Sequence, residues 1–352
     1  MNETKSSRYH RLKRRAGAVS IAATAGLLIA LLLWARPGLP VAAYVLLLAL
    51  LNEALGLPVA FYRGFLLDRR YELSAEPPSA WFRDHLKAFG IATIFAVAAG
   101  QLVYLLIALS AAWWWVAAAA LGTGVTLLLS RLAPILLLPL FYRFTPLERG
   151  PLTDRLLALS TRAGVPVLGV YEWGLGAKTR RANAALVGSG ATRRILLSDT
   201  LLAEYSDDEV EVILAHELAH HVHRDIPKGI ALEFGLLLAS CYAAAAALDA
   251  LWAPLGLNGP GDPAGLPLLL LCGGGVMLAA TPLVNAVSRR NERSADEFAI
   301  ALTRHSDAFV SAMRRLAAQN LAEESPSRTT VWLFHTHPPI DERIAQARAI
   351  GL

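Results

Sequence analysis

The segment His216-Glu217-Leu218-Ala219-His220 determines how the rest of this chain is interpreted. On a helix, His216 and His220 are four residues apart and share one face, so their ring nitrogens can bind the same zinc ion. Glu217 lies one position round the helix and can take a proton from a water bound to that ion. The segment therefore predicts the centre of a zinc protease.

The residues before this segment predict that it lies in the middle of a helix. Ser206 is suited to cap the helix, because Glu209 follows three positions later and can complete a capping box. An apolar face then recurs at helical spacing, at Val210, Ile213, Leu214 and Leu218. The alternative is a solvated helix that is rich in histidine by chance, and the neighbouring His221 and His223 favour it.

The composition of the chain predicts a membrane protein. Of its 352 residues, 55% are hydrophobic and 17% are charged, which is too apolar for a soluble enzyme of this length. The apolar residues form six runs, each long enough to cross the roughly 30 Å of hydrocarbon in a bilayer. For any one run the alternative is a buried core helix. The predicted spans are residues 16–35, 41–62, 88–110, 114–138, 229–251 and 265–287.

The charged residues between the spans predict the orientation in the membrane. Basic residues precede the first span and lie between the second and third, so both segments are expected in the cytoplasm. They are Lys5, Arg8, Arg11, Lys13, Arg14, Arg15, Arg63, Arg69, Arg70, Arg83 and Lys87. The three loops on the other side, 36–40, 111–113 and 252–264, hold one Arg and no Lys, and tryptophans lie at their ends. Six spans with both termini in the cytoplasm is the consistent topology.

Several other classes of protein are disfavoured. The first apolar run is too long for a signal peptide, and no small-residue cleavage site follows it at residues 34–37. The net charge of +5 reflects the basic cytoplasmic loops, and no nucleic-acid-binding module is recognisable. Cys241 and Cys272 both lie in predicted spans, so neither a disulfide framework nor a cysteine metal site is expected. The ratio of 28 Arg to 5 Lys favours a GC-rich bacterial gene, and hence the bacterial inner membrane.

A catalytic zinc needs a third protein ligand and leaves its fourth position for water. Glu292 is the best candidate, because Asp296 lies four residues later on the same helix face and can hydrogen-bond a ligand imidazole from behind. Residues 221–291 contain the fifth and sixth spans, and two crossings return the chain to the side of His220. The alternative is a solvated, charged helix face. Glu297 is a rival ligand, but it turns to another face and leaves no partner that matches Asp296.

At this point the chain resembles a known family. The segment Ser288–Ala299, together with the H-E-x-x-H helix, resembles the integral-membrane zinc metallopeptidases typified by the type I CAAX prenyl protease, with the HtpX protease as a shorter relative. Other segments have counterparts in that family in the same order, namely residues 141–147, 183–185, 195–201 and 337–343. The resemblance extends over roughly residues 45–350.

The spans and the resemblance together imply a fold class. The expected fold is mainly α, a polytopic membrane protein with about six transmembrane helices and a cytoplasmic α+β metalloprotease domain of the gluzincin type, which contains a small β-hairpin or sheet. The expected segments are a basic cytoplasmic N-terminus (1–15), a four-helix transmembrane region (16–138), a metalloprotease part (139–227), transmembrane helices five and six (228–288) and a cytoplasmic C-terminal part (289–352).

The resemblance also implies which residues bind the substrate. Asn183 would contact the peptide, beside a hairpin predicted at residues 182–188 and 193–198, whose edge could hydrogen-bond the peptide as an added strand. Alternatively, Asn183 only turns the chain at the start of that strand.

His337 and Arg343 correspond to the substrate-binding pair near the C-terminus of the family. His337 would act catalytically, by stabilising the oxyanion that develops on the scissile carbonyl. His335 competes for this role, and His337 could instead only cap the chain before Pro338 and Pro339.

Glu53, Arg131 and Glu233 lie within predicted spans, where an unpaired charge is costly. The resemblance implies a hydrated chamber among the helices that these residues would face. The alternative is that Glu53 and Arg131 pair with each other.

The expected function is that of a zinc endopeptidase with one Zn²⁺ per chain, held by His216, His220 and Glu292, with Glu217 as general base and then acid. Its partners would be the lipid bilayer and a peptide or membrane-protein substrate, including a lipidated C-terminal peptide. The first rival is a quality-control protease, because the chain has six predicted spans where the prenyl proteases have seven. The second is a transporter or channel with structural zinc, in which His221 or His223 is a fourth ligand.

Overall fold

The computed structural model describes residues 4–34, 38–188, 190–323 and 326–350. Several predicted features therefore lie partly outside the described residues. They are the start of the basic N-terminus (1–15), the outer loop at 36–40, the cleavage-site residues 34–37, the turn of the predicted hairpin at Ser189 and the end of the C-terminal part (289–352).

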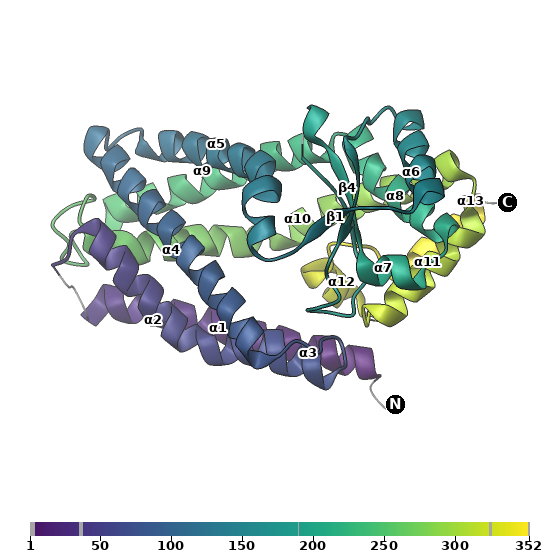
Figure 1. The fold of residues 1–352 in the computed structure, drawn as a ribbon. Coiled ribbons are helices and arrows are strands. Elements are labelled where there is room, and N and C mark those ends of the chain that lie inside the picture. Colours follow the sequence, from purple (N-terminus) through teal and green to yellow (C-terminus); the bar gives the residue numbers. More distant parts are fainter. Residues whose placement is uncertain (1–3, 35–37, 189, 324–325, 351–352) are drawn as a thin grey trace.

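A bundle of long helices lies beside a smaller part that contains a sheet (Figure 1). Within the described residues, six helices are long and apolar enough to cross a membrane. They coincide with the six predicted spans, although α1 and α4 begin earlier and α10 ends later than predicted. Their bounds are α1 Lys5–Trp34, α2 Val41–Phe61, α4 Pro78–Leu109, α5 Trp114–Leu136, α9 Asp225–Leu251 and α10 Leu266–Thr303.

The smaller part contains a mixed sheet with the strand order β1-β2-β4-β3. The predicted hairpin is confirmed, because β3 and β4 pair antiparallel. The sequence did not predict β1 or β2, and β2 runs parallel to β4. The strands are β1 Phe144–Pro146, β2 Gly169–Trp173, β3 Ala184–Val187 and β4 Arg194–Ser198. The helices around them are α6 Gly150–Arg162, α7 Asp199–Glu204, α8 Asp207–Val222, α11 Ser306–Gln319, α12 Arg328–Phe334 and α13 Ile340–Ile350.

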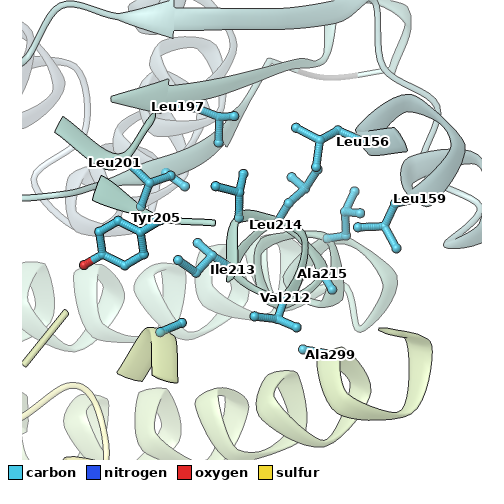
Figure 2. Packing of buried hydrophobic residues seen from close by; sticks show 14 of the residues in the cluster. Leu156, Leu159, Leu197, Leu201, Tyr205, Val212, Ile213, Leu214, Ala215 and Ala299 are labelled. Atoms are coloured by element: carbon cyan, nitrogen blue, oxygen red, sulfur yellow. The ribbon is translucent and has the colours of Figure 1, made fainter. Parts of the chain in front are cut away.

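Helix α8 begins as the sequence predicted and lies at the centre of the core. The Ser206 side chain accepts a hydrogen bond from the Glu209 amide, and the Glu209 carboxylate accepts one from the Ser206 amide. Leucines from α6, β4 and α7 surround Leu214 (Figure 2). Full burial of a leucine side chain stabilises a fold by about 1.5–3 kcal/mol. The helix that carries the two predicted histidine ligands is therefore held on nearly all sides.

Helix α10 is continuous from the sixth candidate span into this core. Its 38 residues correspond to a length of about 57 Å, nearly twice the hydrocarbon thickness of a bilayer. Ala299, near its C-terminal end, is fully buried in the same cluster as Leu214. The sixth span therefore extends as the helix that packs against α8.

Two of the three charged residues expected to face a chamber, Glu53 and Glu233, contact polar side chains of neighbouring helices. Glu53 of α2 pairs with His85 of α4 at 2.6 Å rather than with Arg131. Glu233 of α9 accepts a hydrogen bond from Thr126 of α5 at 2.7 Å. None of the three lines the cavity at the candidate site described below.

Helices α2 and α4 approach each other closely at Gly100. A Cβ atom on Gly100 would lie 2.7 Å from Cγ2 of Val45, whereas a Cβ atom on Gly90 of the same helix would meet no heavy atom within 4 Å. Because the branched side chain of Val45 has few rotamers, it cannot easily give way.

We expect Gly100→Ala to be less stable than Gly90→Ala by about 1–3 kcal/mol, because only the first overpacks the contact while both gain the same helix propensity. Thermal unfolding of the purified protein in detergent measures the difference. Val45→Ala in the Gly100→Ala background should narrow it, and equal stability of the two alanine variants would contradict the close approach.

Candidate metal centre

Helices α8 and α10 bring the three predicted metal ligands together. Nε2 of His216 lies 3.2 Å from Oε2 of Glu292, and Nε2 of His220 lies 3.5 Å from its Oε1. Tetrahedral ligands at bond lengths of about 2.0–2.1 Å lie about 3.3 Å from one another. The spacing of these donor atoms therefore fits a small divalent metal ion, as do their identities.

A carboxylate orients each imidazole from behind. Nδ1 of His216 lies 2.8 Å from Oδ1 of Asp296, and Nδ1 of His220 lies 2.9 Å from Oδ2 of Asp225. A carboxylate on Nδ1 favours the tautomer whose Nε2 lone pair is free for a metal, which is the usual arrangement of metal-binding histidines. Asp296 lies where the sequence predicted.

Asp225 was missed by the sequence analysis. It is the first residue of α9 and follows Arg224, whose φ of 56° turns the chain sharply between α8 and α9. This turn brings Asp225 back alongside His220, only five residues earlier. An acidic residue at the start of a span, just after a histidine ligand, is the signal that could have identified it.

Arg343 of α13 reaches the same centre through Asp296. Its guanidinium donates two hydrogen bonds to the Asp296 carboxylate, at 2.8 and 2.6 Å, and both side chains are buried. Burial lowers the pKa of Arg343, but its hydrogen bonds with Asp296 outweigh this effect and raise that pKa above its ordinary value. Arg343 therefore stays charged, and its predicted contact with substrate stays a prediction.

Glu217 lies on the cavity side of α8, next to the ligands. Burial raises the pKa of Glu217 above its ordinary value of 4.5, and the imidazoles of His216 and His220 oppose the rise. A half-buried carboxylate with a raised pKa is a better proton acceptor than an exposed one.

His337, rather than His335, approaches the candidate ligands. Nδ1 of His337 lies 2.7 Å from Oε2 of Glu292, and its side chain is 61% exposed. Nε2 of His335 instead lies 3.4 Å from Glu323. The geometry therefore distinguishes two histidines that the sequence left as competitors.

The rival ligands lie apart from the centre. Glu297 accepts a hydrogen bond from Gln346 at 2.8 Å. His221 follows His220 on a different helix face, and the His223 ring packs edge-on against Phe298 at 5.6 Å. Neither histidine belongs to the ligand group.

A second group of potential metal ligands is Asp208, Glu211 and His305. Arg155 forms ion pairs with both carboxylates of this group. Arg162 lies 4.0 Å from Glu211 as well, so two arginines face the two carboxylates, and this group is better described as a salt-bridge cluster.

A cavity of about 820 Å³ opens in front of the metal centre. Glu217, His337 and the exposed Asn183 line it, together with residues of α1. Asn183 directly precedes β3, which is an edge strand of the sheet. An edge strand beside a cavity is an arrangement that can bind an extended peptide.

Comparison with protein families agrees with this geometry. A family described as "Peptidase family M48" matches residues 146–350, and one described as "CAAX prenyl protease N-terminal, five membrane helices" matches residues 34–143. The second range contains three of the six candidate spans, α2, α4 and α5.

Individual relatives include bacterial and eukaryotic proteases. The "Uncharacterized metalloprotease YhfN" of Bacillus subtilis is 32% identical over 86% of this chain and 72% of that protein. The "Protease HtpX homolog" of Campylobacter curvus is 30% identical over 55% of this chain and 72% of that protein. "CAAX prenyl protease 1" of Saccharomyces cerevisiae is 29% identical over 49% of this chain but only 39% of the yeast protein.

The fold also matches a solved structure. The crystal structure of S. mikatae Ste24p superposes with a TM-score of 0.84, covering 97% of this chain and 88% of that one. Because the sequence identity is 20%, this likeness concerns the fold.

We expect Asp225→Asn to weaken metal binding about 10- to 100-fold, because the amide orients the His220 imidazole less well and makes it less basic. Competition between the purified protein and a chelator for added Zn²⁺ measures the affinity. Asp249→Asn, an exposed change on the same helix, is the matched control. An affinity of the Asp225 variant within twofold of the wild type would contradict this role.

Proposed function

This chain belongs to peptidase family M48, and on that basis we propose that it is a zinc-dependent membrane endopeptidase whose ion is held by His216, His220 and Glu292. Membership of the family makes it a multi-pass membrane metalloprotease. The observation that carries the assignment of the ligands is their spacing, 3.2 and 3.5 Å between each imidazole and the carboxylate. The carboxylate behind each imidazole supports the same assignment.

When bound, zinc would polarise the scissile carbonyl and lower the pKa of water. Glu217 would accept the proton of the attacking water as its oxygen bonds to the carbonyl carbon. The same carboxyl group would then give the proton to the amide nitrogen as the carbon–nitrogen bond breaks. The position of Glu217 on the cavity wall beside the candidate ligands suits both steps.

Other residues would position the peptide. Asn183 would bind the substrate backbone beside the edge of β3, and His337 would donate an N–H to the developing oxyanion. Arg343 lines the cavity, where it would contact the substrate, and through Asp296 it also holds the His216 imidazole in place.

The location that we propose is the bacterial inner membrane, with the active site and both termini in the cytoplasm. The basic residues at the N-terminus and between α2 and α4 support this orientation. The division of the chain that we propose follows from this orientation. Residues 139–227 and 289–352 form the cytoplasmic catalytic part, and the helices at 228–288 lie between them in the sequence.

The substrate that we propose is a peptide or a membrane protein. The likeness to CAAX prenyl protease 1 favours maturation of a lipidated C-terminal peptide, and the likeness to an HtpX homologue favours quality control of membrane proteins. A transporter with structural zinc is disfavoured, since His221 and His223 lie outside the ligand group.

We expect Glu217→Gln to retain zinc and to lose at least about 10²- to 10⁴-fold in kcat, because the amide cannot accept a proton. Peptide cleavage and metal content are measured on the same purified sample. Glu297→Gln, an exposed change near the site, should match the wild type in both. A Glu217→Gln variant that cleaves at the wild-type rate would show that another group is the base.

The same variant can identify the substrate class, because it should bind substrates without cleaving them. We expect crosslinking in cells followed by mass spectrometry to recover proteins that the Glu297→Gln control does not. Membrane proteins of mixed sequence would support quality control, and a single class of lipidated peptide would support maturation.

A further inference from the structure

We propose that the catalytic cavity contains a carboxylate-binding subsite centred on Arg63, which selects peptides that carry a carboxylate on the C-terminal side of the scissile bond. This inference rests on the proposed protease function and adds a feature of the substrate to it.

Arg63 stands out among the cavity-lining cations because its charge is not balanced. Lys13 pairs with Asp68 at 3.0 Å, Arg14 pairs with Glu323 at 2.7 Å, and Arg343 pairs with Asp296. Within the part of the chain that the structure describes, Arg63 has neither an ion pair nor a hydrogen bond from its side chain, and it is exposed.

The backbone around Arg63 is unusual. Arg63 belongs to the π-helical turn Tyr62–Leu66, which follows α2 and leads into α3 (Leu67–Arg70). Such turns are rare, and they frequently occur at functional sites. The π-helical turn is independent of the observation that the Arg63 side chain has no ion pair or hydrogen bond with the described residues.

The guanidinium of Arg63 lies close to Gly17 of α1, a residue that has no side chain. A Cβ atom on Gly17 would be 3.7 Å from Nη1 of Arg63, and Gly17 itself lines the cavity. A longer side chain at this position would stand over the guanidinium. The glycine therefore leaves the planar donor group open toward the cavity.

The position of β3 predicts which end of the substrate approaches Arg63. Arg181, just before β3, donates hydrogen bonds to Tyr9 of α1 and to Asp68, so the start of β3 lies beside the α1 wall of the cavity. A peptide that pairs antiparallel with the β3 edge runs with its C-terminal end toward that start. Antiparallel pairs are the commoner kind.

A carboxylate is the ligand that these features fit. The guanidinium presents donors in a planar fork that matches a carboxylate bidentately, and such charged hydrogen bonds are stronger in a cavity than in bulk water. Two sources supply this group, the α-carboxylate of a free C-terminus and the side chain of an Asp or Glu.

The test uses the full-length protein with Zn²⁺ and one fluorogenic peptide that the wild type cleaves, in three forms. One form ends in a free acid, one ends in an amide, and one ends in an amide but carries Glu in place of Gln after the scissile bond. We measure kcat and KM for the wild type, Arg63→Gln, Arg63→Lys and the control Arg70→Gln, which removes an exposed arginine outside the cavity.

The wild type and Arg70→Gln should cleave a carboxylate-bearing form with a kcat/KM about tenfold higher than the neutral amide, chiefly through KM. Arg63→Gln should lose this preference yet cleave the neutral amide within about twofold of the wild type, and Arg63→Lys should keep part of it. Preference for the free acid identifies the C-terminus as the source of the group, and preference for the Glu form identifies the side chain.

Other outcomes would overturn the subsite. If the wild type cleaves all three forms equally, or if Arg63→Gln slows all three equally, the protease stands but Arg63 does not select a carboxylate. The same assay is repeated in vesicles that contain anionic phospholipid. If Arg63→Gln lowers kcat/KM only in those vesicles, the arginine binds a lipid headgroup instead of the substrate. Failure of the wild type to cleave any peptide would reject the protease proposal itself, and is distinguishable from these results.

Discussion

The position of one carboxylate between two imidazoles constrains the whole molecule. Glu292 can lie 3.2 and 3.5 Å from the histidines of α8 only if α10 packs against α8 in one register. Since α10 is also one of the helices long and apolar enough to cross a membrane, the register of the sixth candidate span and the geometry of the centre are set together. The catalytic part is therefore not a separate domain attached to an anchor, because one helix belongs to both.

The charged side chains around this centre form a series of pairs that extends outward from the two imidazoles. Asp296 lies between His216 and Arg343, and Asp225 lies behind His220. A buried charge without a partner costs several kcal/mol, so each of these groups depends on the next. The ion pair between Asp296 and Arg343 also attaches α13 to α10, which makes the C-terminal helix part of the metal centre.

Helix α1 contributes to the cavity as well as to the membrane part. Tyr9 and Asp68 bind Arg181 just before the edge strand, while Arg14 binds the buried Glu323 beyond α11. These contacts connect the start of the edge strand and the segment after α11 to the α1 wall of the cavity. A substrate in this cavity would touch both the long helix α1 and the elements that carry the candidate metal ligands.

Local patterns were enough to predict much of this arrangement. The spacing of His216 and His220, the capping residues Ser206 and Glu209, the i, i+4 pair at 292 and 296 and the six apolar runs all depend on helical periodicity or hydropathy, which neighbouring residues carry. Asp225 depends on a left-handed turn at Arg224, and the ion pair of Arg343 and the position of Arg63 beside Gly17 depend on helices far apart in the chain. Only packing brings such residues together, because a long-range contact leaves no periodic trace in one sequence. The amino-acid pattern thus predicted the candidate metal ligands and the class of chemistry, and the tertiary structure decided which carboxylates lie behind the two imidazoles and which cations line the cavity.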